Sequence, residues 1–146
     1  MKRFLAFALA FLALSVTTLR ADDDRIIEFR ELPKAAQQFV TKYFAGRNAV
    51  LVKQDRDFMS TTYEVTLSDG TEIDFTSNGQ WKDVDVKQNT MPLGFIPAQI
   101  TKTLNARHAG DAIKQIERKG RGYKVELSSG LEAYFNARLQ LVRYDD

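Results

Sequence analysis

Cysteine is absent from the 146-residue sequence, and histidine occurs only once, at His108. Without cysteine the chain forms no disulfide, and a single histidine is too few for a zinc site built from cysteine and histidine. The sequence also lacks a phosphate-binding glycine loop, a dinucleotide fingerprint and a nucleophile elbow. We expect His108 to be a half-buried helix residue, since no motif supplies it with a nucleophile. We therefore predict no catalytic residue, no metal and no cofactor.

Long apolar runs are also scarce. The most apolar run covers the thirteen residues Phe4–Val16, whereas a helix needs about 20 apolar residues to span a membrane. This run follows Lys2 and Arg3 and precedes Ala21, an arrangement typical of a secretory signal peptide. We expect cleavage after residue 21, a periplasmic or secreted location, and no membrane attachment of the mature chain.

An excess of one charge is absent from the expected mature chain. Cleavage removes Lys2, Arg3 and Arg20 from the 21 basic residues, which leaves 18 against 19 acidic residues and a net charge of −1. A nucleic-acid binder shows a strongly basic patch or stripe, so we exclude nucleic acid as a partner. The remaining 125 residues are enough to form one compact core.

What the chain does contain is an internal repeat. Seven of thirteen positions are identical between YEVTLSDGTEIDF at 63–75 and YKVELSSGLEAYF at 123–135. Upstream of each, PKAAQQFVTKYFAG at 33–46 corresponds to PAQITKTLNARHAG at 97–110. Apolar residues at helical spacing, between an initial proline and a final glycine, predict one helix in each copy.

Strand signals follow each predicted helix. In residues 63–68, apolar and polar residues alternate, and this period of two indicates a half-buried strand. The sequences SDG and SSG predict hairpin turns, and each copy then contains a return strand and a final strand. Each copy is thus expected to form one helix and four antiparallel strands.

The predicted fold is α+β, with two tandem repeats joined into one sheet of about eight strands and both helices on one face. The expected boundaries are 1–21 for the signal peptide, 22–86 for the first repeat, 87–95 for a linker and 96–146 for the second repeat. The acidic run at 22–24 is expected to lie in solvent as a mobile terminus.

A set of residues in the first copy identifies the scaffold: Leu32, Pro33, Tyr43, Phe44, Tyr63, Glu64, Val65, Asp69, Gly70, Phe75, Gly79 and Trp81. This pattern resembles that of the secreted bacterial PepSY-like, β-lactamase-inhibitor-like proteins, a family of unknown function. The second copy keeps Ile96, Pro97, Tyr123, Val125, Gly130 and Phe135. It has Leu139 and Leu141 in place of Gly79 and Trp81, so we expect its terminal hairpin to be longer or differently turned.

The resemblance covers about residues 29–146 and implies an exported protein with helix-plus-sheet repeats and no established catalytic activity. Structural relatives include an inhibitor that holds a β-lactamase against a concave sheet, and PepSY domains of protease propeptides. Because a shared fold does not transmit function, no binding residue is carried over from these relatives.

Two groups of residues are candidates for binding. The segment between the first two strands of the first copy is four residues longer than its counterpart and carries Phe58 and Met59. These side chains are predicted either to pack beneath the linker or to form an exposed anchor, since aromatic residues and methionine are enriched at interfaces. Tyr134, Val142 and Tyr144 are expected to form a second group on the open face of the sheet.

We predict a non-enzymatic module that binds or inhibits another exported protein or peptide through the open sheet face. One alternative is a periplasmic sensor of a small ligand or ion, for which Asp83 and Asp85 are a weak signal because calcium takes six to eight oxygens. Another is a carboxylate-dependent hydrolase, which needs two facing carboxyl groups; Glu64, Glu72 and Asp74 share one predicted sheet face. The sequence indicates neither the partner nor the oligomeric state.

Overall fold

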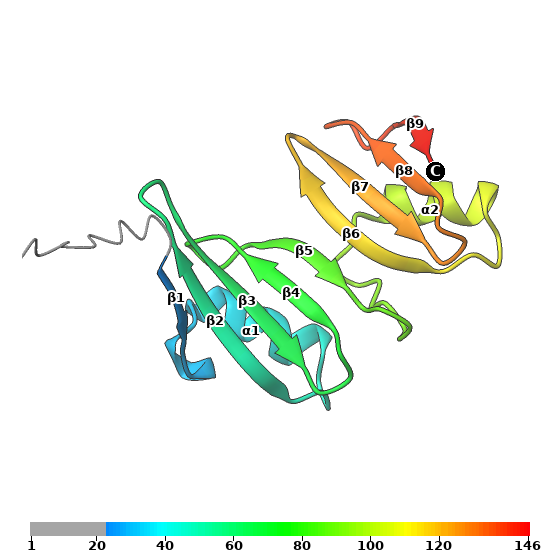
Figure 1. Cartoon of the computed structure of the whole chain (residues 1–146). Helices are drawn as coiled ribbons and strands as arrows, with labels where there is room; N and C mark the ends of the chain where they lie inside the picture. The colour runs from blue at the N-terminus through cyan, green and yellow to red at the C-terminus, as the bar shows by residue number, and fades with distance from the viewer. Residues whose placement is uncertain (1–22) are drawn as a thin grey trace, which may run out of the picture.

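The computed structural model describes residues 23–146, which form one antiparallel sheet of nine strands with two helices on one face (Figure 1). The strands are β1 (Asp23–Ile26), β2 (Ala49–Arg56), β3 (Thr61–Leu67), β4 (Glu72–Phe75), β5 (Trp81–Asp85), β6 (Ile113–Lys119), β7 (Gly122–Leu127), β8 (Glu132–Phe135) and β9 (Leu141–Asp145). The helices are α1 (Lys34–Tyr43) and α2 (Ala98–Arg107), with a 3-10 turn at Phe29–Glu31. The strands lie in the sheet in their sequence order. The predicted α+β class and single sheet are confirmed.

Each helix follows a proline and ends before a glycine, as predicted. Pro33 and Pro97 occupy the positions just before α1 and α2, where the missing N–H of proline costs nothing. Gly46 and Gly110 come after the helices, with φ angles of 85° and 87°. The buried helix faces are formed by residues four positions apart: Ala36, Val40, Ile100 and Leu104.

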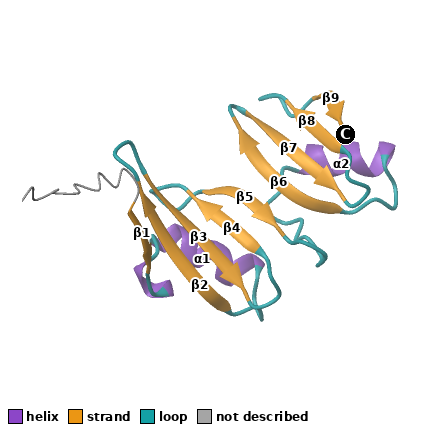
Figure 2. Ribbon diagram, viewed as in Figure 1, coloured by secondary structure: helices purple, strands orange, loops and turns teal. Residues whose placement is uncertain are grey.

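One hydrophobic core lies between the sheet and the two helices (Figure 2). Alternate residues of the strands enter it, as the period of two requires. The fully buried strand residues include Val65, Leu67, Ile73, Phe75, Val84, Ile116, Val125, Leu127 and Ala133. The other face of the sheet carries no helix and is open to solvent (Figure 2).

The ninth strand, β1, was not predicted. Its residues pair with the outer edge of β2, with Arg25 opposite Gln54 and Ile26 opposite Lys53. The expectation of a mobile acidic terminus is therefore wrong for Asp23 and Asp24, because an unpaired strand edge offers backbone hydrogen bonds to a neighbouring segment. The predicted signal peptide, 1–21, lies outside the described residues.

The segment between β5 and α2 is packed against the core. Met91 and Ile96 are buried, although this segment shows no periodicity in the sequence. The Phe95 ring lies 5.0 Å from that of Phe39 and 5.3 Å from that of Trp81, measured between centroids. These aromatic contacts attach the segment to α1 and β5.

The two terminal hairpins, β4–β5 and β8–β9, have turns of the same length and the same backbone pattern. In one, Thr76 N–H donates to Gln80 O, and in the other Asn136 N–H donates to Gln140 O. Leu139 takes a left-handed φ of 60°, where Gly79 has 83°. The expected difference in turn is therefore wrong: the Asn136 side chain accepts hydrogen bonds from two turn N–H groups and offsets the strain of a non-glycine residue.

Candidate functional site

A continuous row of side chains crosses the open face of the sheet, one from each strand. The pairing registers give its members in order: Ile26, Lys53, Glu64, Asp74, Asp83, Glu117, Lys124, Tyr134 and Arg143. The four central members are acidic, and a lysine flanks them on each side. We call Glu64, Asp74, Asp83 and Glu117 the carboxylate row. Neighbouring strands are about 4.8 Å apart, so these like charges are close together.

The carboxylate row is only partly compensated by neighbouring groups. The Gln115 amide donates to both carboxylate oxygens of Asp83, at 2.9 and 3.0 Å. Within residues 23–146, the side chains of Glu64 and Asp74 form no direct ion pair and accept no hydrogen bond. Like charges directly opposite one another on neighbouring strands are destabilising, so this part of the face is electrostatically strained.

Two members of the carboxylate row have a raised pKa. The pKa of Asp74 is raised to about 6, mainly by burial and also by the nearby Asp83 and Glu64 carboxylates, while Lys82 opposes these effects. Burial also raises the pKa of Asp83, against the lowering effect of the Gln115 hydrogen bond. A cationic ligand would relieve both effects, because an opposite charge favours the ionised carboxylate.

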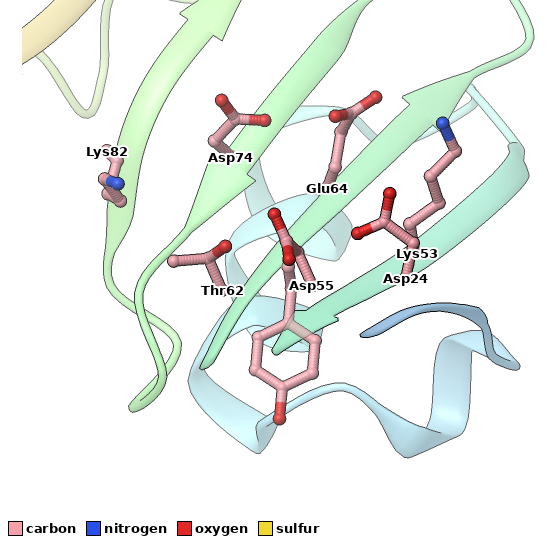
Figure 3. Close-up of a pocket in the computed structure, with 8 residues that line it drawn as sticks. Asp24, Lys53, Asp55, Thr62, Glu64, Asp74 and Lys82 are labelled. Atoms are coloured by element: carbon pink, nitrogen blue, oxygen red, sulfur yellow. The ribbon is translucent and has the colours of Figure 1, made fainter. Parts of the chain in front are cut away.

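A polar pocket of about 170 Å³ lies at one end of the carboxylate row (Figure 3). Its lining consists of Asp24, Lys53, Asp55, Thr62, Tyr63, Glu64, Asp74 and Lys82. Figure 3 shows the amines of Lys53 and Lys82 on opposite sides of the carboxylates of Glu64 and Asp74. A smaller depression continues along the face to Asp83, Asp85 and Gln115. The lining is mostly charged and favours polar ligands.

The part of the face formed by β7–β9 carries paired charges instead. Lys124 Nζ lies 3.1 Å from Glu132 Oε1, and the Tyr134 hydroxyl donates to Glu132 at 3.0 Å. The Arg143 guanidinium carbon lies 3.7 Å from the centre of the Tyr134 ring. Tyr134 is therefore covered by a cation and tied to an ion pair, which leaves it little surface for a partner.

The predicted group of Tyr134, Val142 and Tyr144 does not form. A β-bulge in the pairing of β8 with β9 places Tyr144 opposite the buried Ala133, on the helix side of the sheet. The Tyr144 hydroxyl is hydrogen-bonded to His108 Nε2 at a distance of 2.9 Å. Val142 is 57% exposed. The prediction was wrong because one extra residue in a strand reverses the side of those that follow.

Phe58 and Met59 lie at the tip of the β2–β3 hairpin. Their exposed fractions are 86% and 79%, so the alternative that they pack beneath the linker is wrong. The predicted grouping of Glu64, Glu72 and Asp74 on one face agrees with the strand registers. Sequence reasoning did not extend that group to Glu117, because the pairing of β5 with β6 joins segments separated by α2.

Neither a metal site nor a membrane-spanning helix is evident among the described residues. Within 23–146, no three side chains of histidine, aspartate or glutamate are arranged to hold a metal ion. No helix of this part of the chain is long and apolar enough to cross a membrane. The arrangement is instead an extended anionic surface, suited to binding by charge.

Comparison with known proteins identifies the scaffold. The family model described as "Putative beta-lactamase-inhibitor-like, PepSY-like" matches residues 61–143. The chain belongs to this PepSY-like family. No curated protein matches it.

Solved structures extend the match to most of the chain. A "putative calcium-regulated periplasmic protein" from Bacteroides thetaiotaomicron is 32% identical with a TM-score of 0.82, covering 85% of this chain and 98% of that one. A "putative periplasmic protein of unknown function" from Bacteroides vulgatus is 33% identical with a TM-score of 0.81, covering 85% and 100%. A second protein from Bacteroides vulgatus, of the DUF2874 family, is 27% identical with a TM-score of 0.81, covering 85% and 98%. All three are described as periplasmic, and this PepSY-like chain is likewise a periplasmic or secreted protein.

Proposed function

We propose that this PepSY-like protein is a non-enzymatic binding module that holds a positively charged surface of another exported protein or peptide against its open sheet face. The carboxylate row is the observation that carries this proposal. Four adjacent carboxylates that form no direct ion pair among the described residues favour a basic partner, both by attraction at a distance and by relief of their repulsion on contact. Where the partner is an enzyme, occlusion of its surface would inhibit it without any cofactor.

The size of the sheet supports a protein-sized partner. Nine strands at about 4.8 Å spacing make a face roughly 38 Å wide. A standard interface needs about 800 Å² on each partner, which a face of this width provides. We attribute the width to tandem duplication of a helix and four strands, with repeats at 22–86 and 96–146 joined by 87–95.

A carboxylate-dependent hydrolase is the weaker alternative. Asp74 has the raised pKa of a general acid and lies opposite Glu64 on the neighbouring strand. However, the pocket that they line has a volume of about 170 Å³. Small-molecule sites usually occupy about 300–1,000 Å³ and have a largely apolar lining. The volume and the charged lining therefore favour surface binding over turnover.

Binding of an inorganic cation is a second candidate. The same carboxylates attract divalent cations, and the Bacteroides thetaiotaomicron relative is described as calcium-regulated. Calcium takes six to eight oxygen ligands, so the carboxylates would have to move together to hold it. A saturable rise in melting temperature with calcium, larger than that with magnesium and lost in Asp74→Asn/Asp83→Asn, would support this candidate.

A defined cationic probe tests the proposal. We expect a ten-residue lysine peptide to bind the wild-type chain in isothermal titration at low salt and to be released at high salt. Asp74→Asn/Asp83→Asn should weaken this binding by about tenfold, because it removes two charges from the centre of the row. The matched control Asp145→Asn/Asp146→Asn removes the same charge at the sheet edge and should bind almost as the wild type does. Equal binding by the two variants would contradict the proposal.

A further inference from the structure

We infer that the tip of the β2–β3 hairpin, residues Asp57–Ser60, is a preformed anchor that inserts Phe58 and Met59 into an apolar pocket with a basic rim on a partner protein. The inference rests on the proposed function for the basic character of that partner. It adds a second contact, which is stabilised by burial of apolar surface and not by charge.

The tip presents two large apolar side chains on a backbone that is held by hydrogen bonds. Phe58 and Met59 are adjacent and almost fully exposed, at 86% and 79%. The Asp57 carboxylate accepts hydrogen bonds from Met59 N–H at 2.8 Å and from Ser60 N–H at 2.7 Å, and Asp57 N–H donates to Ser60 O. A rigid anchor loses little entropy on binding, so this order raises the affinity that the two side chains can supply.

The corresponding hairpin in the second half shows that folding does not require this tip. There β6 and β7 are joined by Gly120 and Arg121 alone, with no apolar residue in the turn. Of the four extra residues in the first hairpin, one lengthens each strand and two lengthen the turn. Both turns connect paired strands. Because the shorter turn does so without an apolar side chain, Phe58 and Met59 are not needed to form the hairpin. Aromatic residues and methionine are enriched in interfaces, where such side chains are buried.

Charge identifies the kind of pocket that would accept the tip. Asp57 lies within it, and Asp24 and Asp55 face each other on β1 and β2 just below, so acidic residues outnumber the nearby Arg25 and Arg56. An apolar pocket with an acidic rim would be repelled, whereas one with lysine or arginine at its rim would be attracted. Figure 1 shows the hairpin projecting from the end of the sheet, free of the helices.

The tip is continuous with the carboxylate row. β3 leads from the tip at Thr61 to Glu64, about 10 Å away at the usual rise per residue. Asp55 and Thr62, near the tip, also line the pocket that contains Glu64 and Asp74. One partner can therefore contact both, with the carboxylate row steering its approach and the tip slowing its departure.

The test separates the two contacts by their kinetics. Proteins of a periplasmic extract that the immobilised mature chain retains are identified, and each is purified and its binding measured as a function of salt. We expect Phe58→Ser/Met59→Ser to weaken binding of a true partner by about 30-fold through a faster dissociation rate, with the salt dependence unchanged. Asp74→Asn/Asp83→Asn should instead slow association and reduce the salt dependence. Val142→Ser, which removes another exposed apolar side chain, should have no effect.

Each other outcome decides between the two claims. Loss of binding in the row variant alone would overturn the anchor and leave the proposed function in place. Loss in the tip variant alone, without salt dependence, would support the anchor and overturn the charge-based proposal. If no retained protein distinguishes any variant from the wild type, both fall. Circular dichroism of the tip variant should match that of the wild type, because neither side chain is buried.

Discussion

The two halves of the molecule, α1 with β2–β5 and α2 with β6–β9, share several buried strand residues and differ at the centre of the open face. Val65, Leu67 and Phe75 in the first half have the same residue types as their counterparts in the second, and all are buried. On the open face, Glu64 and Asp74 correspond to Lys124 and Tyr134. Packing thus constrains one side of each strand, and the other side is free to differ.

The consequence is an open face whose two halves differ in charge. In the second half Glu132 is bonded to both Lys124 and Tyr134, so these charges are paired within the protein. In the first half Glu64 and Asp74 have no such partners among the described residues. Like charges thus remain adjacent in the carboxylate row, whereas the charges on β7–β9 are paired, and this contrast is consistent with the proposed binding function.

The largest expected effect concerns the terminal turn of the first half, compared with the β7–β8 turn of the second. A Cβ atom on Gly79 would lie 2.9 Å from Ala36 N and 2.9 Å from Pro33 Cβ, at the start of α1. We expect Gly79→Ala to lower the free energy of unfolding by about 3 kcal/mol, because it adds this clash to the strain of a left-handed residue. Urea denaturation would measure it. Gly130→Ala, with the same type of φ but open space around it, should cost only about 1 kcal/mol. Equal costs would show that the close approach to α1 is not what requires glycine.

A smaller effect is expected from the carboxylate row. The folded pKa of Asp74, about 6, exceeds its unfolded value of 3.8, so the folded state binds the proton more tightly. Its contribution is fully present below pH 3.8 and is lost as the pH rises through 6. Asp74→Asn should therefore be more stable than the wild type at pH 7, by about 1 kcal/mol after allowance for solvent screening, and not at pH 4. Denaturation at the two pH values would measure the difference.

Glu132 in the other half provides the control of opposite sign. Hydrogen bonds from Lys124 and Tyr134 lower its pKa below 4.5, so its contribution is present above that pH and is lost on acidification. Glu132→Gln should be less stable than the wild type at pH 7 and should match it at low pH. The comparison between the halves fails if Asp74→Asn and Glu132→Gln change stability in the same direction at pH 7.

The smallest expected effect lies at the helix ends. Phe44, after α1, is buried, whereas the corresponding His108, after α2, is hydrogen-bonded to Tyr144. Tyr144→Phe should lower the free energy of unfolding by about 0.5 kcal/mol, since the bond is partly exposed to solvent. Thermal unfolding would detect it, and in His108→Phe the same tyrosine substitution should have no further effect. A full additional loss in that background would show that the hydrogen bond is not the cause.

The sequence by itself determined the local structure of this PepSY-like protein. A proline precedes each helix and a glycine follows it, and the period of two identified the strands that come next. The residues shared with the family identified the scaffold. These signals are readable because helix spacing and strand alternation depend on residues close together in the chain.

Only the tertiary structure decided which side chains meet. The carboxylate row exists because β5 pairs with β6 across the segment that contains α2, a contact between residues more than 30 positions apart. The bulge in β9 places Tyr144 on the opposite side of the sheet from Tyr134, and β1 pairs with the outer edge of β2. Register, bulges and edge pairing follow from the balance of backbone hydrogen bonds and packing over the whole sheet, and no local pattern of residues specifies that balance.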